Sequence, residues 1–556
     1  MSPKPVVPGG PQTVSDLRFS ALLQARLAAH PQAPAFVHRE GVTTVASLAH
    51  QVQCMTAWLR AAGIGPGDRV AVWLVNRVEW LALLMAAARI GATVAAVNTR
   101  YRREEVAHIL RTSGARLLVT QLPHQRLDFL AILAGLDPAQ VPDLQQVAVL
   151  GSGSAAPAGV ADLAAGLAWP LVPLDWRQCA PDTGPDDSDP DATVVLFSTS
   201  GTTKAPKLVM HPQRTLVDHA LRCTAAYRLD APGACLLTLL PLCGAFGLNS
   251  TLAAFAAGAP VVLPALFEAD EAAALLAGHA VTHCFGSDEM VRRLAESSEA
   301  ARPFASLRFF GFGAFTSNFT EIAQACCARG IPLHGLYGSS EVLAVFSAQA
   351  GDLPLAQRLE GGGMPVAGAQ ARIRIRDEAT GQLLPQGQSG QIEIQAPSLF
   401  QGYFGNPAAT EEAMCEGYFK TGDLGHLRPD GSLVFETRLG DAVRLGGNLV
   451  NPAEIEELLQ RDPGVREAQV VAVPIQGQDR PVAFIIPEVG AGPDTAALLA
   501  QLRQSIAGYK VPQRVWTVEA FPLTQGANGN KISRAQLRRL AQERLAAETS
   551  QPQEFA

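Results

Sequence analysis

The segment from Ser198 to Lys207, STSGTTKAPK, places five hydroxyl groups, one glycine and two lysines within ten residues. Backbone N–H groups, side-chain hydroxyls and ammonium groups are donors that proteins use to bind a polyphosphate. The segment therefore predicts a phosphate-binding loop and some form of nucleotide chemistry. A polar hairpin turn is the alternative interpretation, because apolar strands are expected on both sides, at Thr193–Phe197 and Leu208–Met210.

Two common nucleotide-binding motifs are incomplete in this chain. A Walker P-loop ends in Gly, Lys and Ser or Thr and continues into a helix, whereas this loop is expected to return to a strand. Gly311 and Gly313 form part of a dinucleotide-binding fingerprint, but Thr316 stands where its third glycine belongs. The sequence thus disfavours an ordinary P-loop hydrolase and gives no support to a Rossmann dehydrogenase.

The composition favours small molecules over nucleic acid as partners. The 556 residues carry a formal net charge of −7, which gives no general attraction to nucleic acid or to anionic membranes. The nine cysteines include no CxxC pair, so neither a disulfide framework nor a zinc site is predicted, and a reducing cytoplasm is the expected location. The longest apolar stretch, Trp80–Val97, is interrupted by Arg89 and Gly91. It predicts a buried helix followed by a strand, and no transmembrane segment.

The elements that would position the loop alternate between helices and strands. From residue 15 to 140, helical patterns alternate with short Val-rich strands, as at Asp68–Leu74. Similar signals from Thr193 to Leu336 predict a large, mostly parallel sheet. Further along the chain, short alternating strands such as Ala371–Arg376 and Gly390–Gln395 predict a smaller β-rich subdomain.

The predicted fold class is α/β. A large N-terminal domain would contain α/β subdomains and the β-rich subdomain, and a small, mobile α+β domain would follow it. The expected boundaries are a disordered start at residues 1–14, the large domain at 15–439, the C-terminal domain at 440–548 and a disordered tail at 549–556.

Two segments have more specific expectations. Gly151–Ala192 is rich in Ala, Gly, Pro and Asp and is expected to be a surface connection within the large domain. Asn451, Pro452 and Glu454 have the composition of a capped helix start, so a helix is predicted from Pro452 onward.

The phosphate-binding loop is one of several motifs that occur in a fixed order. The others are NTRYRREEV at Asn98–Val106, YGSSE at Tyr337–Glu341, TGD at Thr421–Asp423, NPAEIEE at Asn451–Glu457 and GNK at Gly529–Lys531. Together they resemble the adenylate-forming superfamily, which comprises acyl-CoA synthetases, adenylation domains and luciferases. The resemblance covers the chain from about Ala49 to Arg534.

The resemblance implies a binding site for ATP. Adenine would stack on Tyr337, the ribose hydroxyls would bind Asp423, and Arg438 would contact the ribose and the phosphates. Taken alone, these residues would be a core tyrosine, a turn aspartate and an exposed arginine, so their joint order carries the interpretation. The full implied set is Thr199, Ser200, Gly201, Thr202, Thr203, Lys207, Gly313, Tyr337, Gly338, Ser340, Asp423 and Arg438.

The same resemblance implies two catalytic residues. Glu341 would coordinate the Mg²⁺ that bridges phosphate oxygens, with Thr199 as a second oxygen ligand. Without the other motifs, Glu341 would be interpreted as a solvated acid at a helix start. Lys531 would orient the substrate carboxylate and neutralise charge around the α-phosphate. The usual Ser-Gly-Lys ending is here Asn528, Gly529, Asn530, Lys531, so one extra residue shifts this turn.

Three glycines relate to the second half of the implied reaction. Gly440 stands where the family usually has the Asp or Lys of a hinge, so mobility is kept while a side-chain hydrogen bond is lost. Gly446 and Gly447 would line a narrow tunnel for the pantetheine arm of CoA, the alternative being a β-turn before the Pro452 helix.

The acid itself is constrained only in outline. Amino-acid adenylation domains bind the substrate ammonium with an Asp, whereas Ala245–Asn249 has no carboxylate, which disfavours an amino acid. Gly244 replaces the gate-like His of many acyl- and aryl-CoA synthetases. Asp288 and Glu289 are better explained as the first turn of a helix than as substrate ligands. The implied acyl pocket is mainly apolar and comprises Phe246, Gly311, Gly335, Leu336 and Leu343, so an uncharged fatty, cyclic or aryl tail is expected.

The implied activity is that of an AMP-forming acid–thiol ligase. ATP would activate a small carboxylic acid to an acyl-adenylate with release of pyrophosphate, and CoA would then form the thioester with release of AMP. ATP, Mg²⁺ and CoA are the expected cofactors, and a homodimer is left open. The alternatives are loading of a carrier-protein phosphopantetheine and a catalytically silent nucleotide-binding protein.

Overall fold

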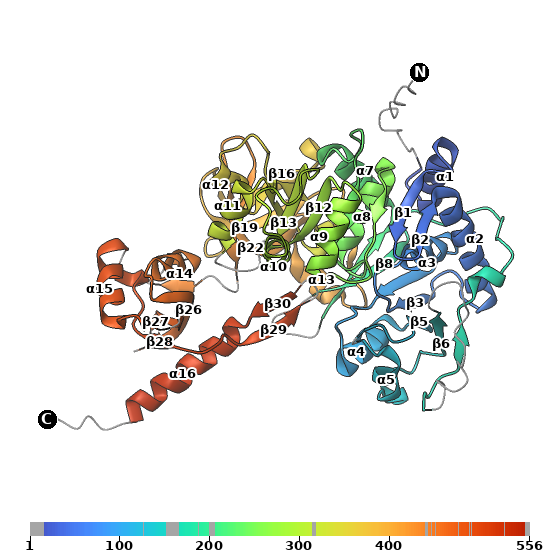
Figure 1. Cartoon of the computed structure of the whole chain (residues 1–556). Coiled ribbons are helices and arrows are strands. Elements are labelled where there is room, and N and C mark those ends of the chain that lie inside the picture. The colour runs from blue at the N-terminus through green and yellow to red at the C-terminus, as the bar shows by residue number, and fades with distance from the viewer. Residues whose placement is uncertain are drawn as a thin grey trace, which may run out of the picture. The chain divides into compact units, whose positions relative to one another are not determined.

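The computed structural model forms two compact units (Figure 1). The first unit holds the described residues up to Gly313 together with Cys326–Arg372 and Ile394–Phe419, and the second holds those of Ala314–Ala325, Ile373–Glu393 and Lys420 onward. The structure describes residues 16–125, 127–151, 166–186, 188–199, 206–313, 319–439, 443–445, 448–450, 452–475, 478–488, 490, 492–506, 508–526 and 529–550.

An eight-stranded sheet in the first unit carries the ends of the predicted phosphate-binding loop. Its order is β20-β9-β8-β4-β3-β5-β6-β7. Neighbours from β8 to β7 are parallel, whereas β9 runs antiparallel to β8 and to β20. The strands are β3 Arg69–Val72, β4 Thr93–Ala96, β5 Leu117–Gln121, β6 Gln146–Leu150, β7 Leu171–Pro173, β8 Thr193–Ser198, β9 Leu208–Pro212 and β20 Gly402–Tyr403. The strand predicted at Asp68–Leu74 is therefore confirmed as β3.

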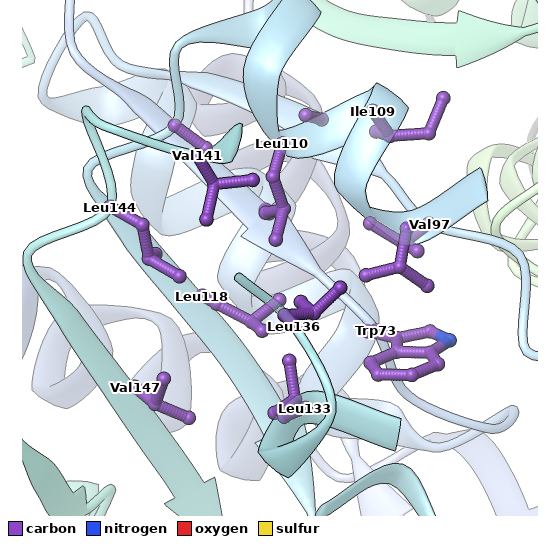
Figure 2. Close-up of a cluster of buried hydrophobic side chains, with 14 of the residues drawn as sticks. Trp73, Val97, Ile109, Leu110, Leu118, Leu133, Leu136, Val141, Leu144 and Val147 are labelled. Carbon is purple, nitrogen blue, oxygen red and sulfur yellow. The ribbon is translucent and has the colours of Figure 1, made fainter. Parts of the chain in front are cut away.

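Helices cover both faces of this sheet. On one face, α4 (Arg103–Ser113) and α5 (Phe129–Ala134) pack onto a buried cluster around Trp73, Leu118 and Leu133 (Figure 2). The Trp73 and Phe129 rings meet edge-on with centroids 4.8 Å apart, a favourable aromatic geometry. Alternate strand residues point to the opposite face, where Figure 1 shows α2 (Val45–Ala61) and α3 (Val78–Arg89). The buried helix and strand predicted for Trp80–Val97 are α3 and β4.

Strands of another sheet pair within the same unit in the order β16-β15-β14-β13-β12-β10-β11-β1-β2. Its strands are parallel from β14 to β1, and the remaining neighbours are antiparallel. The mostly parallel strands predicted between Thr193 and Leu336 are thus confirmed, but they belong to two sheets. Strands β8 and β9 lie in the eight-stranded sheet, and α7 then carries the chain to β10 in the other sheet. The strands are β1 Pro34–His38, β2 Gly41–Thr44, β10 Leu236–Thr238, β11 Val261–Val262, β12 His283–Ser287, β13 Phe309–Gly313, β14 Leu333–Tyr337, β15 Ser347–Ala348 and β16 Gly362–Pro365.

The helices not yet named connect these strands or flank them. They are α1 Phe19–Ala29, α7 Gln213–Ala226, α8 Ala245–Ala257, α9 Ala269–Gly278, α10 Asp288–Glu296, α11 Phe319–Ala328, α12 Leu355–Arg358 and α13 Pro407–Ala413. At the start of α10, the Ser287 hydroxyl accepts a hydrogen bond of 3.3 Å from the Met290 backbone N–H. The prediction that Asp288 and Glu289 occupy the first turn of a helix is therefore confirmed.

The segment Gly151–Ala192 is more than the surface connection that the sequence predicted. Strand β7 lies within it and pairs in parallel with β6, through Val147 and Leu171. A short 3₁₀ turn follows at Trp176–Gln178. The Ala, Gly and Pro content hid a three-residue edge strand, which backbone pairing rather than side-chain pattern stabilises. Residues 152–165 and 187 lie outside the described residues.

In the second unit, strands pair in the order β18-β17-β19-β22-β23, and a three-stranded sheet has the order β26-β27-β28. In the first of these, Arg374 and Arg376 pair with the fully buried Glu393 carboxylate, at 2.5 and 2.9 Å. The predicted short strands after Leu359 are confirmed as β17 and β19. The bounds are β17 Arg372–Arg376, β18 Leu383–Leu384, β19 Gly390–Gln395, β22 Tyr418–Leu427, β23 Leu433–Arg438, β24 Val443–Leu445, β25 Asn448–Val450, β26 Val465–Ile475, β27 Gln478–Pro487, β28 Val515–Thr517, β29 Leu523–Gly526 and β30 Gly529–Ile532. Strand β21, Met414–Cys415, belongs to the first unit.

Among the described residues, three helices lie wholly in the second unit, α14 (Pro452–Gln460), α15 (Thr495–Ser505) and α16 (Arg534–Ser550), and residues 319–325 of α11 also belong to it. The helix predicted from Pro452 is confirmed, whereas its expected cap Asn451 lies outside the described residues. Two apolar clusters lie on opposite faces of β26 and β27, one around Ile455 and one around Phe484. Within the described part of the chain, no helix is both long and apolar enough to cross a membrane.

Candidate active site

The predicted phosphate-binding loop begins and ends in a β-hairpin. Strands β8 and β9 pair from Thr193 to Pro212, with Ser198 opposite Leu208. Beyond this pair, the Thr199 N–H donates to the Lys207 carbonyl at 2.9 Å, and the Lys207 N–H donates to Thr199 Oγ1 at 3.1 Å. We call this pair, Thr199 and Lys207, the loop neck. The expected return from loop to strand is confirmed, while Ser200, Gly201, Thr202 and Thr203 lie outside the described residues.

The motif at Asn98–Val106 and the helix after it hold both sides of the loop neck. The Tyr101 hydroxyl shares a 2.9 Å hydrogen bond with Ser198 Oγ, and burial raises the pKa of Tyr101. On the other side, His108 Nε2 donates to the Pro206 carbonyl at 2.8 Å, which fixes the protonated nitrogen of this ring. Sequence reasoning noticed the motif but missed this role, because the contacts join residues about a hundred positions apart.

The carboxyl ends of two neighbouring parallel strands bring other predicted site residues together. Gly313 ends β13 and Tyr337 ends β14, and the two strands are paired through Phe312 and Gly335. Ligands of open α/β sheets bind at such strand ends. Tyr337 is buried, with 7 % of its surface exposed, so one face of an adenine ring would meet a rigid side chain.

The segment after β14 folds back tightly on Gly338. A Cβ atom at this position would lie 1.3 Å from the Ala344 carbonyl oxygen, so only glycine fits. Leu343 and Ala344 adopt left-handed backbone conformations with φ of 65° and 56°. Such strain in non-glycine residues persists only where surrounding contacts enforce it, and it is frequent at functional sites. The tight turn presents Glu341 from the short 3₁₀ helix Ser340–Val342.

Glu341 is connected to the loop neck through a residue that the sequence did not single out. The Tyr403 hydroxyl donates to Glu341 Oε1 at 2.9 Å, and Lys207 Nζ lies 4.5 Å from the centre of the Tyr403 ring. Burial and the neighbouring Glu341 carboxylate raise the pKa of Tyr403 far above its ordinary range. Only the GY pair at Gly402 and Tyr403, followed by a helix start at Asn406, gave a hint in the sequence.

A buried histidine supports the same segment from below. His211 in β9 donates from Nε2 to the Ser340 carbonyl at 2.7 Å. Burial lowers the pKa of His211 to about 4, so the ring is neutral at physiological pH. Strand β9, which follows Lys207 of the loop neck, thus also holds Ser340, the residue before Glu341.

In the second unit, Asp423 and Arg438 face each other across β22 and β23. Arg438 Nε lies 3.4 Å from Asp423 Oδ1, and the Asp423 N–H donates to Thr421 Oγ1 at 3.0 Å. Asp423 is buried, whereas half of the Arg438 side chain is exposed, at 51 %. A buried carboxylate held by an arginine is well suited to accept hydrogen bonds from a ribose diol.

The predicted catalytic lysine lies in a two-stranded hairpin. Lys531 in β30 stands opposite Thr524 in β29, and Gly529 stands opposite Gly526. The side chain of Lys531 is not among the described parts of the structure. Gly440, Gly446 and Gly447 also lie outside the described residues. Their predicted roles stay predictions.

The predicted acyl-pocket residues lie on β13, β14, the turn after β14, and α8. Phe246, Leu336 and Leu343 are buried. Gly311 faces three side chains, since a Cβ there would lie 2.7 Å from Leu336 Cδ1 and about as close to Phe309 and Phe285. Gly335 faces backbone, because its Cβ would lie 1.9 Å from the Glu360 carbonyl oxygen. Close packing alone therefore explains why glycine occupies both positions, whether or not they line a pocket.

The comparison with known proteins places this chain in a family. A family model described as AMP-binding enzyme matches residues 23–404, and one for the AMP-binding enzyme C-terminal domain matches residues 454–528. The chain belongs to the AMP-binding enzyme family. The resemblance to the adenylate-forming superfamily is confirmed, as are the α/β fold with a large N-terminal and a small C-terminal domain and the class of AMP-forming acid–thiol ligase.

Relatives of this AMP-binding enzyme are ligases that differ in their acid and in their acceptor. A fatty acid–[acyl-carrier-protein] ligase of Streptomyces coeruleorubidus is 29 % identical over 91 % of this chain and 93 % of its own. A 2-succinylbenzoate–CoA ligase of Geobacillus kaustophilus is 30 % identical over 89 % of this chain and 93 % of its own. The ATP-bound MatB structure from Rhodopseudomonas palustris aligns with a TM-score of 0.77 at 26 % identity, and covers 94 % of this chain and 99 % of its own.

The described residues of this AMP-binding enzyme fit a magnesium nucleotide. Glu341 Oε1 accepts the Tyr403 hydrogen bond, which leaves Oε2 for a cation. Thr199 Oγ1 accepts one hydrogen bond and keeps a lone pair. Among the residues that the structure describes, no three His, Cys, Asp or Glu side chains gather as metal ligands. Mg²⁺ needs no such cluster when one or two protein oxygens and substrate phosphates hold it.

Proposed function

We propose that this AMP-binding enzyme activates a carboxylic acid with ATP to an acyl-adenylate, releases pyrophosphate, and then forms a thioester with CoA. The observation that carries the proposal is the convergence of Lys207, Tyr403 and Glu341 at the loop neck. It brings an ammonium group and a carboxylate to the base of a loop rich in hydroxyls, as a magnesium triphosphate requires.

In the first half-reaction, a carboxylate oxygen of the acid attacks the α-phosphorus of ATP. The bond from that phosphorus to the bridging oxygen breaks, and pyrophosphate leaves with the electron pair. Lys207 and the loop hold the β- and γ-phosphates, Asp423 accepts from the ribose hydroxyls, and Lys531 neutralises charge on the α-phosphate. Glu341 and Thr199 would hold a bound Mg²⁺, whose charge would neutralise that of the phosphates.

In the second half-reaction, the CoA sulfur attacks the acyl carbonyl carbon, and the thiol proton passes to solvent. AMP then leaves with the electrons of the acyl–oxygen bond. Family members turn the small domain about a hinge between the two steps, and we place that hinge at Gly440, at the proposed boundary between residues 439 and 440. Gly446 and Gly447 are proposed to admit the pantetheine arm, because glycine lets backbone approach a ligand closely.

The test incubates the purified protein with ATP, Mg²⁺ and a panel of straight-chain, branched, cyclic and aromatic acids, with and without CoA. Mass spectrometry then scores adenylates and thioesters. Acid-dependent acyl-CoA is the expected product. Nucleotide binding with neither product across the panel would contradict the proposal and favour a silent nucleotide-binding protein.

A carrier-protein acceptor is the second candidate, and a relative that loads an acyl-carrier protein motivates it. It shares the first half-reaction and differs in the thiol. Adenylate formation without acyl-CoA, followed by acyl transfer to a phosphopantetheinylated carrier protein, would support it.

The location and the assembly of the protein are tested separately from its reaction. A reaction that consumes ATP and CoA is expected in the cytoplasm, and cell fractionation followed by immunoblotting would test this. Light scattering coupled to size-exclusion chromatography would separate a monomer from a homodimer.

A further inference from the structure

Tyr403 is placed beside the loop neck by strand pairing. It lies in the two-residue strand β20, opposite Val209 in β9, and β9 begins directly after Lys207. The next residue, Phe404, donates its N–H to the Leu208 carbonyl at 2.8 Å. The register of this pairing therefore fixes the position of Tyr403 relative to Lys207, although the two are far apart in sequence.

Tyr403 is itself held in place by several contacts. Its backbone N–H donates to Thr410 Oγ1 at 2.9 Å. The Phe400 ring meets the Tyr403 ring edge-on with centroids 5.0 Å apart, and the Phe400 N–H donates to the Glu341 carbonyl at 2.8 Å. Only 6 % of Tyr403 is exposed. A side chain so constrained loses little conformational entropy when it orients other groups.

One phenol thus contacts two oppositely charged groups. The face of its ring receives the Lys207 ammonium at 4.5 Å, within the range of a cation–π interaction. Its hydroxyl donates to Glu341 Oε1, since a carboxylate only accepts hydrogen bonds. The first contact restrains a long, flexible side chain, and the second orients a carboxylate and leaves one oxygen available.

We propose that Tyr403 is a positioning residue for magnesium ATP, which holds the Lys207 ammonium for the phosphates and the Glu341 carboxylate for the cation. The inference rests on the proposed function, because it assumes that these two residues bind the magnesium nucleotide. A partner that fixes a ligating carboxylate raises metal affinity without touching the metal. The hydroxyl of Tyr403 should therefore affect the binding of Mg²⁺ through Glu341, whereas its ring should affect the binding of the phosphates through Lys207.

The alternative is that Tyr403 only packs against Phe400 and stabilises the fold. Two substitutions distinguish these roles. Tyr403→Phe removes the hydroxyl and keeps the ring under Lys207, whereas Tyr403→Leu removes both contacts. Tyr227→Phe is a matched control, because it deletes another buried tyrosine hydroxyl in the same unit, one that donates to the Val345 carbonyl at 2.8 Å.

The experiment measures ATP binding by calorimetry in the absence of acid, at limiting and at saturating Mg²⁺. For Tyr403→Phe we expect about tenfold weaker binding at limiting Mg²⁺, because a hydrogen bond to a charged group is lost, and recovery towards wild type at saturating Mg²⁺. For Tyr403→Leu we expect a further loss of about threefold that Mg²⁺ does not relieve. Tyr227→Phe is expected to lower thermal stability alone.

A double-mutant cycle with Glu341→Gln tests whether the hydroxyl acts through the carboxylate. The Tyr403→Phe effect is expected to vanish in the Glu341→Gln background. Wild-type binding by Tyr403→Phe, or a loss equal at all Mg²⁺ concentrations, would overturn the inference. Failure of the wild-type protein to bind ATP with Mg²⁺ would instead overturn the proposed function.

Discussion

The tight turn after β14 allows a quantitative test at Gly338. A Cβ atom there would lie 1.3 Å from the Ala344 carbonyl oxygen and 2.7 Å from the Ala344 Cα. Contacts of Cβ atoms essentially never fall below 3.0 Å, so Gly338→Ala must open this approach by about 1.7 Å. Both partners are backbone, so no side-chain rotation relieves the clash, and the segment that carries Glu341 must move.

The displacement predicts a large kinetic effect. A shift of about 1 Å at positioning groups costs on the order of a hundredfold in rate, so we expect kcat/KM for magnesium ATP to fall at least about a hundredfold in Gly338→Ala. Overpacking of this kind also costs about 1–3 kcal/mol of stability, which circular dichroism during heating would detect. Acid-dependent pyrophosphate release is the assay.

Gly278→Ala is the matched control for this substitution. Gly278 is the last residue of α9, and a Cβ atom there meets nothing within 4 Å. The control should keep wild-type kinetics and stability. Gly338→Ala with pyrophosphate release within threefold of wild type would refute the reasoning, since the turn would then tolerate a displacement that the geometry excludes.

Three further predictions address other parts of the molecule. Lys531→Ala should lower pyrophosphate release about 10²- to 10³-fold, because one preorganised charge partner is lost, and near-normal release would refute its assignment. Gly440→Pro should impair one half-reaction more than the other, and equal loss of adenylate and thioester formation in single-turnover assays would place the hinge elsewhere. Burial lowers the pKa of His211 and of His283 to about 4, so below pH 6.5 the unfolded chain takes up protons that the folded chain does not. The melting temperature should therefore fall as the pH is lowered from about 6.5 to 4. The melting temperature of the His283→Gln variant should fall less steeply over the same range. Parallel curves of melting temperature against pH for the two proteins would contradict this linkage.

The sequence predicted those elements whose stability is local. The hairpin at the loop neck followed from a β-branched run and an apolar run around a polar segment, and the first turn of α10 followed from Ser287 and the acids after it. The helix from Pro452 was equally clear from its composition. In each case neighbouring residues determine the structure, so a single sequence contains the information.

Contacts between distant segments were not predictable in the same way. Tyr403 reaches Glu341 only because β20 pairs with β9, and the pairing of a two-residue strand has no recognisable side-chain pattern. Strand β7 was missed for the same reason. Tyr101 lay in the recognised motif Asn98–Val106 and His108 two residues after it, but their partners at Ser198 and Pro206 depend on the order of β4 and β8 in the sheet.

The glycines at the strand ends show how one residue type serves two physical purposes. The resemblance to the adenylate-forming superfamily implied that Gly311 and Gly335 line the acyl pocket. In the structure, the space beside Gly335 contains the Glu360 carbonyl, and the space beside Gly311 contains Leu336 Cδ1. Backbone cannot yield to a ligand without moving a strand, whereas a leucine side chain can change rotamer. We therefore predict that an acyl tail reaching β13 has to displace or pass Leu336, and that this side chain, rather than the backbone beside Gly335, limits the length of the acid.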